Sequence, residues 1–408
     1  MTKLDKLIQE LCPDGVQFLR IPELFTTRNG YTPSKANSEF WENGTIPWFR
    51  MEDIRTNGQI LTEATQCVSK KAVKGRVFPE NSIIVATSAT IGEHALIKVP
   101  SLANQRFTYL VLKDEFKSSV DMMFIFYYCF KLDEYCKTHL NQGNFASVDM
   151  KQFAEFHFPV PPLPVQREIV RILDNFTELT AELTAELTAR KQQYAYYRDK
   201  LLDRPHDSTR IVTIGELGSW SGGKTPSMDN SDYWENGTTP WITSKDMKVS
   251  TLEDTENHIT EKAISEASMT VYPPNGVAVV TRSGILKHTL PVAFVPFATT
   301  VNQDIKMLVA GEGVLPRYAF HAIQGKSPDI LAKAKKQGGT VDSLEFKKFL
   351  DYEIPLPSLE VQKHLVEVLD NFDAICTDLS SGLPAEIEAR QKQYEYYRDK
   401  LLSFEEKI

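Results

Sequence analysis

One stretch of the chain matches a pattern that binds phosphate in other proteins. Residues 218–225 read GSWSGGKT, which fits the G-x₄-G-K-T pattern of a phosphate-binding loop. Such a loop requires a helix that starts at its Lys-Thr pair. Pro226 follows at once and disfavours helical backbone at Thr225. We therefore expect no ATP site here.

A second stretch imitates a metal-dependent nuclease. Pro328-Asp329, followed by Glu345 and Lys347, resembles a PD…ExK motif, but these residues lie where no strand pattern occurs. The chain also contains no Asn/Asp-Pro-Pro-Tyr/Phe motif and no G-x-G-x-x-G motif. The residues thus offer no visible means of cutting or methylating DNA.

Composition excludes several other classes of protein. The cysteines occur at positions that form no C-x-x-C pair and have no His-x₃₋₅-His partner: Cys12, Cys67, Cys129, Cys136 and Cys376. A structural zinc site is therefore not expected, and scattered cysteines fit small buried residues in a reducing cytoplasm. The N-terminus is too charged for a secretory signal, and Met122–Phe130, the longest apolar run, predicts a core helix instead of a membrane span. The net charge of −8 argues against a uniformly basic surface, although a local positive surface remains compatible with it.

The chain repeats itself, first in short motifs. Residues 40–48 read FWENGTIPW and residues 233–241 read YWENGTTPW. A Gly-x-Thr-Pro-Ser motif stands ahead of each, at residues 30–34 and 223–227. The same order of turns, β-branched runs and Pro-rich segments follows in both halves.

The most similar segments close each copy. Residues 189–202 read ARKQQYAYYRDKLL and residues 389–402 read ARQKQYEYYRDKLL. The spacing between copies grows from 193 residues at the Gly-x-Thr-Pro-Ser motifs to 200 at these segments, so small insertions have accumulated since a duplication. Each copy combines short β-branched runs with a few helical stretches, which predicts an α+β domain.

A long helix is predicted to follow each domain. From Val165 to Leu202 apolar residues alternate at spacings of three and four with no Pro or Gly between them, as in a coiled coil, which would make a helix of roughly 57 Å. The matching stripe of the second copy runs from Val361 through Leu379 to Leu401. We expect the two helices to pack together in antiparallel orientation. The second helix should kink or break at Ser380–Pro384.

The tetrapeptide TAEL occurs twice in tandem, at residues 180–183 and 184–187. Four residues are close to one helical turn, or ~6 Å, so tandem copies lengthen the helix and nearly preserve its apolar face. A plain pair of bundle helices is the alternative to a spacer of defined length.

These motifs together resemble those of type I restriction–modification specificity subunits. The resemblance rests on the opening LCPDGV, the two Gly-x-Thr-Pro-Ser…Pro-Trp segments, the stretch VVTRSGILKHTLPVA and the duplicated YYRDKLL helices. The TAEL tandem resembles the type IC group in particular. The boundaries expected on this basis are an N-terminal helical segment at 1–16, recognition domains at 17–160 and 209–356, and spacer helix regions at 161–208 and 357–408.

The resemblance implies DNA, partners and a division of labour. Each domain would read one half of a bipartite target, and the helices would set the spacing of the halves and dock two methyltransferase subunits. Those subunits would hold the S-adenosylmethionine, with no cofactor or metal bound by this chain, and restriction subunits would complete the complex. Alternatives from other classes are a stand-alone methyltransferase or nuclease and a protein-binding scaffold.

Sequence-specific DNA binding requires side chains that hydrogen-bond to base edges and phosphates. Candidates in the first domain are Thr32, Lys35, Arg50, Thr87, Ser88, Thr90, Gln105 and Arg106. Candidates in the second are Lys224, Thr225, Ser244, Lys245, Arg282, Ser283, Lys287, His288, Asn302 and Gln303.

The halves should read different sequences, so residues shared by both copies fit scaffold or phosphate contacts better than base reading. Arg282 is the leading candidate base reader, followed by Arg50 and Arg106; an ordinary surface ion pair is the alternative for each. The matched tryptophans Trp41, Trp48, Trp234 and Trp241 are expected in the core rather than stacked on bases. The helix ends are assigned to helix–helix or methyltransferase contacts through Tyr196, Tyr197, Arg198, Tyr396, Tyr397 and Arg398.

Overall fold

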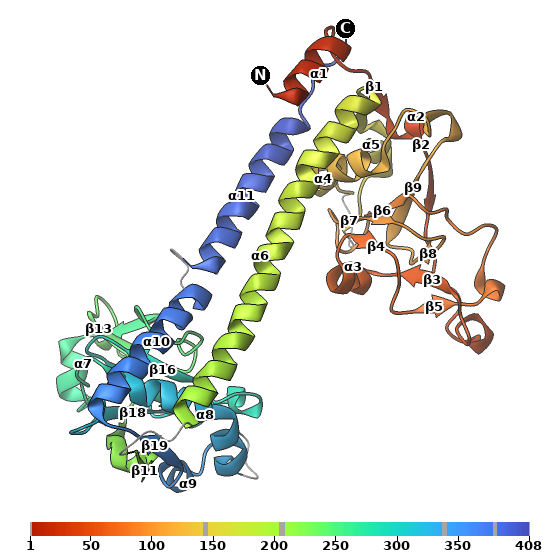
Figure 1. The fold of residues 1–408 in the computed structure, drawn as a ribbon. Coiled ribbons are helices and arrows are strands. Elements are labelled where there is room, and N and C mark those ends of the chain that lie inside the picture. Colours follow the sequence, from red (N-terminus) through yellow and green to blue (C-terminus); the bar gives the residue numbers. More distant parts are fainter. Residues whose placement is uncertain (1, 142–145, 204–208, 337–340, 378–381, 408) are drawn as a thin grey trace. The chain divides into compact units, whose positions relative to one another are not determined.

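A computed structural model of the chain describes residues 2–141, 146–203, 209–336, 341–377 and 382–407. The chain divides into two compact units, residues 1–182 with 388–408 (unit 1) and residues 183–387 (unit 2). Both mix helices with small sheets, as the predicted α+β class requires (Figure 1). Helix α6 (Leu163–Asp203) gives its first half to unit 1 and its second half to unit 2.

Unit 1 begins with a short helix, and all but one of its strands precede its main helix, α4, in the sequence. Its strands are β1 (Phe18–Arg20), β2 (Phe25–Asn29), β3 (Ile46–Phe49), β4 (Ile60–Leu61), β5 (Cys67–Val68), β6 (Ser82–Ala86), β7 (His94–Ile97), β8 (Leu102–Ala103), β9 (Phe107–Leu112) and β10 (His157–Pro159). Its helices are α1 (Lys3–Leu11), α2 (Ile21–Leu24), α3 (Met51–Asn57), α4 (Met122–Thr138), α5 (Met150–Glu155) and most of α11 (Leu383–Leu401), besides the first half of α6.

Unit 2 repeats this plan. Its strands are β11 (Arg210–Thr213), β12 (Gly218–Gly222), β13 (Thr239–Ile242), β14 (Asn257–Ile259), β15 (Gly276–Val280), β16 (Val292–Val295), β17 (Thr300–Val301), β18 (Ile305–Ala310) and β19 (Glu353–Leu356). Its helices are α7 (Glu261–Glu266), α8 (Pro316–Ala334), α9 (Phe346–Leu350) and α10 (Leu359–Thr377), and 3₁₀ turns include η6 (Gly284–Lys287).

The sheet topology confirms the duplication. The main sheet has the order β2-β9-β6-β7-β4 in unit 1 and β12-β18-β15-β16 in unit 2. A second, three-stranded sheet has the order β5-β3-β8 or β14-β13-β17, with one parallel pair in each case. The two-stranded sheets β1-β10 and β11-β19 close the copies. The halves therefore have the same fold, except that the place of β4 is taken in unit 2 by a single parallel bridge between Thr251 and Phe294.

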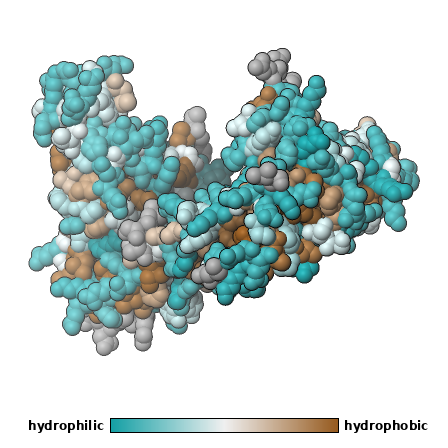
Figure 2. Space-filling model, turned by 90° about the horizontal axis from the view of Figure 1, so that it is seen from above, coloured by the Kyte–Doolittle hydropathy of each residue, from teal (hydrophilic) through white to brown (hydrophobic). Residues whose placement is uncertain are grey.

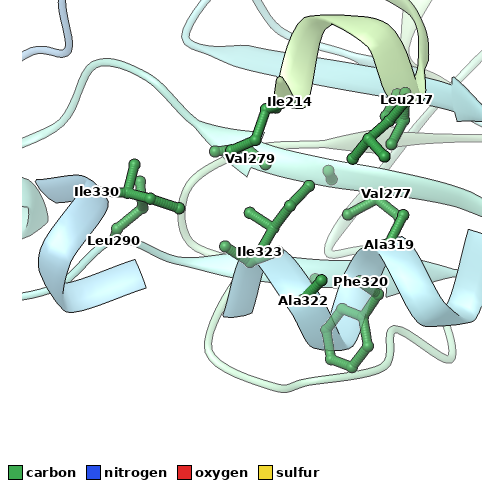
Figure 3. Close-up of a cluster of buried hydrophobic side chains, with 14 of the residues drawn as sticks. Ile214, Leu217, Val277, Val279, Leu290, Ala319, Phe320, Ala322, Ile323 and Ile330 are labelled. Atoms are coloured by element: carbon green, nitrogen blue, oxygen red, sulfur yellow. The ribbon is translucent and has the colours of Figure 1, made fainter. Parts of the chain in front are cut away.

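One helix of each unit packs on the main sheet. Met122–Phe130, predicted as a core helix, lies in α4, and its side chains join the strands β6 and β9 in one apolar cluster. In unit 2 the equivalent helix α8 places Ile323 and Ala319 beside Val277 and Leu217 (Figure 3). Burying apolar side chains of this size stabilises each unit by about 1.5–3 kcal/mol per side chain.

The long helices have the predicted antiparallel arrangement. In unit 1 the ring of Phe176 on α6 stacks on Tyr397 of α11, with centroids 5.6 Å apart. In unit 2 Tyr197 of α6 stacks on Phe372 of α10, with centroids 6.4 Å apart. Residue numbers rise along α6 as they fall along its partners, so the helices run in opposite directions. The second copy forms two helices, α10 and α11, and the predicted break at Ser380–Pro384 overlaps residues outside the described ranges, as does Leu379.

A buried glutamine joins the start of each long helix to its unit. The Gln166 amide of α6 accepts from the backbone N–H of Asp121 (2.8 Å) and donates to the carbonyls of Ser119 (2.9 Å) and Pro161 (2.6 Å). Asp121 is the N-cap of α4. The glutamine thereby accepts a hydrogen bond from a backbone N–H at the N-terminus of α4, where N–H groups have no partner within the helix.

Gln362 makes the same three bonds in unit 2. It accepts from the N–H of Leu315, the N-cap of α8, and donates to the carbonyls of Gly313 and Pro357. Gln166 and Gln362 are both completely buried. In each copy the same glutamine therefore joins the long helix to the turn before it and to the start of the helix that packs on the main sheet.

An ionic network reinforces this junction in unit 2. The imidazole of His321 on α8 hydrogen-bonds through Nε2 to Asp370 Oδ1 on α10 (2.6 Å), and Arg317 donates to the same oxygen (2.7 Å). Burial lowers the pKa of His321 despite the hydrogen bond to Asp370. In unit 1 a neutral tyrosine does the corresponding task, since the Tyr127 hydroxyl donates to Asp174 (2.6 Å).

The chain ends meet within unit 1. Val16 forms a parallel bridge with Glu406, and Lys3 of α1 forms an ion pair with Glu168 of α6 (2.7 Å). Hydrophilic residues dominate the surface visible in Figure 2, with hydrophobic residues in small groups between them. Among the described residues no helix has the length and apolarity needed to cross a membrane. The expectation of small buried cysteines is met at Cys12, Cys129 and Cys136, whereas Cys67 is half-buried.

We predict that Gln166→Leu and Gln362→Leu each lower the free energy of unfolding by about 2–5 kcal/mol, because each leaves buried backbone groups without partners. Hydrogen exchange of the full chain should accelerate in α4 for the first variant and in α8 for the second. Gln192→Leu, at an exposed position of α6, is the matched control. Equal effects of all three changes would contradict a structural role for the buried pair.

Candidate functional site

The predicted polar residues of unit 1 gather at one edge of its main sheet. There β2 ends, β9 begins and β6 ends, as the pairings of Asn29 with Thr108 and of Ala86 with Phe107 show. The strands β3 and β8 of the second sheet also end there, because the Asn104 N–H donates to the Phe49 carbonyl (3.0 Å). We call the connecting segments the loop edge of unit 1; they are residues 30–35, 50, 87–90 and 104–106.

The loop edge of unit 2 has the same construction. Its Asn302 N–H donates to the Ile242 carbonyl (3.0 Å), and the N–H of Thr281 donates to the Asp304 carbonyl (2.8 Å). The counterpart of the latter bond in unit 1 joins Thr87 to Arg106 (2.9 Å). These equivalences place the segments 223–228, 243–245, 281–288 and 302–304 at one edge.

Two tryptophans fix the Gly-x-Thr-Pro-Ser loop in each unit. The indole N–H of Trp48 donates to the Tyr31 carbonyl (2.9 Å), and that of Trp41 donates to the Ser34 carbonyl (3.0 Å). The indoles of Trp241 and Trp234 bind the carbonyls of Lys224 and Ser227 in the same way, each at 3.0 Å.

The rings of each pair also pack edge to face, with centroids 5.1 Å apart in unit 1 and 5.0 Å in unit 2. Trp48 and Trp241 are buried, while Trp41 and Trp234 are half-buried. All four indole N–H groups are thus used within the protein, as the core interpretation of the matched tryptophans requires.

The glycine of this loop is required by close packing. A Cβ at Gly30 would lie 2.2 Å from the Asn104 carbonyl oxygen, and one at Gly223 would lie 1.6 Å from the Val301 carbonyl oxygen. Both obstacles are backbone atoms of the segment that carries the Asn-Gln pair. The loop and that segment therefore behave as a single rigid element.

A side-chain bond links the two halves of this element in both units. The Thr32 hydroxyl donates to the Gln105 side-chain oxygen, and the Thr225 hydroxyl donates to that of Gln303. Both glutamines are exposed. Neither amide nitrogen donates to another of the described residues, so its donors stay available at the same place in both copies.

The copies differ at the positions around this element. Ser88 of unit 1 is equivalent in position to Arg282 of unit 2. Each forms a β-bridge to the segment that follows the main helix of its own unit, Ser88 with Ser147 and Arg282 with Ser343. Arg106 is equivalent to Asp304, because the backbone N–H of each donates to the side-chain oxygen of the asparagine two residues before it (3.0 Å). In unit 2 the Arg282 Nε lies 3.8 Å from Asp304 Oδ1.

Arg50 is another position of difference. Its counterpart is Thr243, since the backbone N–H of each donates to the carboxylate of an aspartate three residues later in the chain, at 2.7 Å. The Arg50 guanidinium lies over the Trp48 ring, 5.7 Å from its centroid. Its buried Nε has no hydrogen-bond acceptor among the described residues.

The remaining candidates divide by exposure. Thr87 and Asn302 are buried: the Thr87 hydroxyl bonds to that of Thr108 (2.9 Å), and the Asn302 side chain accepts from the Asp304 N–H. They position neighbouring residues instead of facing solvent. The exposed candidates are Lys35, Gln105, Arg106, Lys224, Thr225, Lys245, Arg282, Lys287, His288 and Gln303; Thr32, Arg50, Ser88, Thr90, Ser244 and Ser283 are half-buried.

The helix-end residues also divide. Tyr197 and Tyr397 take part in the helix–helix stacking, whereas Tyr196 and Tyr396 are 59% and 62% exposed. Arg198 and Arg398 pair with the adjacent Asp199 and Asp399 and cover the rings of Tyr194 and Tyr394. The exposed tyrosines are free to contact a partner.

The two misleading motifs have ordinary structural roles. Residues 218–222 form strand β12, and no helix begins at Lys224-Thr225, so the geometry of a phosphate loop is not present. Asp329 lies in helix α8 and pairs with Lys333 (2.7 Å), while Glu345 pairs with Lys348 (3.0 Å). In the part of the chain that the structure describes, no three His, Cys, Asp or Glu side chains gather as metal ligands.

A cleft of about 860 Å³ lies elsewhere in unit 1. Its lining includes Ser82, where β6 begins, and Leu112, where β9 ends. This is the edge of the main sheet opposite to the loop edge. The cleft therefore contains none of the residues that the sequence selects.

Comparisons with known proteins agree on one family. The family model for the type I restriction modification DNA specificity domain matches residues 13–190 and again 207–389. The specificity subunit of the type I restriction enzyme EcoprrI from Escherichia coli is 38% identical over 398 residues, which cover 93% of this chain and 92% of that protein. The EcoR124I/EcoR124II specificity subunit from Escherichia coli is 48% identical over 246 residues, 60% of this chain and 61% of that protein.

Solved structures share the fold. A chain from a study of complex assembly and conformational transition of the type I R-M system has a TM-score of 0.67 at 16% identity, covering 96% of this chain and 98% of that one. The HsdS subunit from Thermoanaerobacter tengcongensis has a TM-score of 0.50 at 15% identity, with coverage of 96% and 97%. At these identities the likeness concerns the fold alone.

We predict that Gly30→Ala and Gly223→Ala each destabilise their unit by about 1–3 kcal/mol, because the added methyl group meets backbone atoms that cannot yield without moving a strand. Denaturant unfolding would measure the loss. Gly284→Ala is the control, since a Cβ there meets no atom within 4 Å. If Gly30→Ala behaved like the control, the rigid packing of the loop would be contradicted.

Proposed function

Since the chain belongs to the family of type I restriction–modification DNA specificity subunits, we propose that each loop edge contacts one half of a split DNA target. The observation that carries the proposal is the duplicated rigid element, on which the surrounding polar residues differ between the copies. A shared scaffold with different side chains at equivalent positions is what two domains need in order to read two different sequences with the same fold.

The shared Thr–Gln pair is assigned to the DNA backbone. The side-chain oxygens of Gln105 and Gln303 accept from threonine, which leaves their amide donors available. A base reader such as glutamine on adenine uses both its oxygen and its nitrogen, whereas a phosphate needs donors only. The positions that differ, above all Arg282 and Arg106, are assigned to base reading.

The chain acts as a recognition subunit, and the chemistry is left to its partners. We assign S-adenosylmethionine and the methyl transfer to methyltransferase subunits, two of which would dock on the long helices, and cleavage to restriction subunits. The exposed Tyr196 and Tyr396 lie at equivalent places on α6 and α11 and suit a matched pair of docking sites. The cytoplasm is the proposed location of the complex.

Methylome sequencing tests the whole proposal. Cells that carry this chain with its methyltransferase subunits should contain a split adenine-methylation motif that disappears when the chain is deleted. The purified chain with S-adenosylmethionine alone should leave DNA unmethylated. A continuous motif, or methylation by the isolated chain, would overturn the proposal.

The Arg282→Ala variant should relax or shift only one half of the methylated motif. Loss of a two-bond contact between an arginine and a guanine reduces discrimination by about 1–3 kcal/mol, or roughly 5- to 150-fold. The measurement is the distribution of methylated sequences in the variant strain. Arg210→Ala, at an exposed arginine of the same unit outside the loop edge, should leave both halves unchanged.

A third TAEL copy after Leu187 should lengthen the gap between the half-sites. The insertion adds ~6 Å to α6, compared with about 3.4 Å for each base pair, so we expect a gain of one or two base pairs with both half-sites unaltered. Sequencing of methylated sites reports the gap directly. An unchanged gap would refute a spacer role of α6.

A further inference from the structure

A basic hollow in unit 2 lies beside the loop edge. It has a volume of about 550 Å³, and its lining contains three lysines, Lys287, Lys335 and Lys336, with one carboxylate, Asp342. Pro328, Leu331 and Ala332 of helix α8 complete it. The hollow is joined to the loop edge through the backbone, because the Ser283 N–H donates to the Asp342 carbonyl (3.0 Å) and Arg282 forms a bridge with Ser343.

One of the lysines builds the hollow and two face outward. The Lys335 ammonium donates to the Leu286 carbonyl (3.1 Å) and pairs with Asp342 (3.0 Å), so it fixes the turn η6 against the end of α8. Leu286 of the same turn is completely buried and packs in the apolar core of unit 2. Lys287 and Lys336 are exposed, and neither makes an ion pair or a side-chain hydrogen bond with the described residues.

Two lysines of the hollow have uncharged counterparts in unit 1. The bridge of Lys335 with Leu344 corresponds to that of Leu140 with Val148, which places Leu140 where unit 2 has Lys335. Lys336 likewise corresponds to Asn141, since their N–H groups donate to the carbonyls of Ser343 (2.8 Å) and Ser147 (2.9 Å). The η6 turn itself is an insertion, because the connection between β6 and β7 is shorter than that between β15 and β16. At these two positions the positive charge is therefore found in unit 2 alone.

We infer that this hollow binds the DNA backbone beside the half-site that unit 2 contacts, with Lys287 and Lys336 as phosphate ligands and Lys335 as the residue that positions them. The inference rests on the proposed function and extends it. Lysine ammonium groups next to base-reading positions neutralise phosphates and add affinity without sequence information. Lys335 is neutralised by Asp342, so Lys287 and Lys336 leave the hollow with two unpaired positive charges, which favour a polyanion. Because the hollow is continuous with Arg282, this polyanion is the DNA duplex that the loop edge of unit 2 contacts. The two halves of the target are consequently held with unequal strength.

The test compares the wild-type chain with the double variant Lys287→Gln/Lys336→Gln. Fluorescence anisotropy would measure the affinity of the full-length chain, with its methyltransferase subunits, for a duplex with the methylated motif and for a random duplex across a salt series. We expect the variant to lose affinity for both duplexes by a similar factor. The slope of log K against log salt should become less steep by about two, one for each phosphate contact. The methylated motif in cells should be unchanged.

Lys347→Gln/Lys348→Gln is the matched control, since it removes the same charge from exposed positions of α9 in the same unit. Its salt slope should equal that of the wild type, and thermal unfolding should show all proteins folded. An identical slope for the hollow variant and the control, or a change in the second half of the motif, would overturn the inference. Failure of the proposed function is a separate outcome, because the wild-type complex itself would then show no preference for the motif duplex.

Discussion

The architecture depends on one buried amide that occurs twice. The side chains of Gln166 and Gln362, near the start of a long helix, each bind three backbone groups: two in the segment that leads into α4 or α8, and one in the turn before the long helix. Because both donors and the acceptor are used in a buried site, rotation of the long helix about its own axis would break these bonds. The helix that packs on the main sheet, and the loop edge at the end of that sheet, therefore have a fixed orientation relative to the first turns of the long helix.

At the loop edge, the residues that fix the loop are the same in both units, and the residues that differ lie around them. Tryptophan indoles, a glycine that admits no Cβ and a Thr–Gln pair hold the same loop in both units. Under the proposed function, none of these groups has to change when the recognised sequence changes, because the differing positions lie next to the rigid element and outside its core. A single substitution at such a position costs little stability, since surface substitutions away from buried groups stay within about 0.5 kcal/mol.

Much of this could be predicted from the sequence because repetition is visible without coordinates. The duplicated motifs predicted two α+β domains, and the apolar stripes predicted the long antiparallel helices. Burial of individual polar residues could not be predicted in this way: Thr87 has the same residue type as exposed threonines, and only the pairing of β6 with β9 places its hydroxyl against Thr108. Lys335 and Lys336 were missed for a related reason, since they lie far along the chain from Arg282 and only the bridge to Ser343 brings their segment to it.

The charge at the loop edge shows how the two units can differ on one scaffold. At two equivalent positions unit 1 has Ser88 and Arg106, whereas unit 2 has Arg282 and Asp304. An aspartate facing DNA without a partner would repel the phosphates, but Asp304 lies 3.8 Å from the Arg282 Nε and neutralises part of its charge while restricting its directions. The guanidinium thus lies next to a different strand in each unit, since Arg106 precedes β9 and Arg282 follows β15. Under the proposed function, a change of recognition requires an exchange at these two positions, and the buried framework that both units share stays as it is.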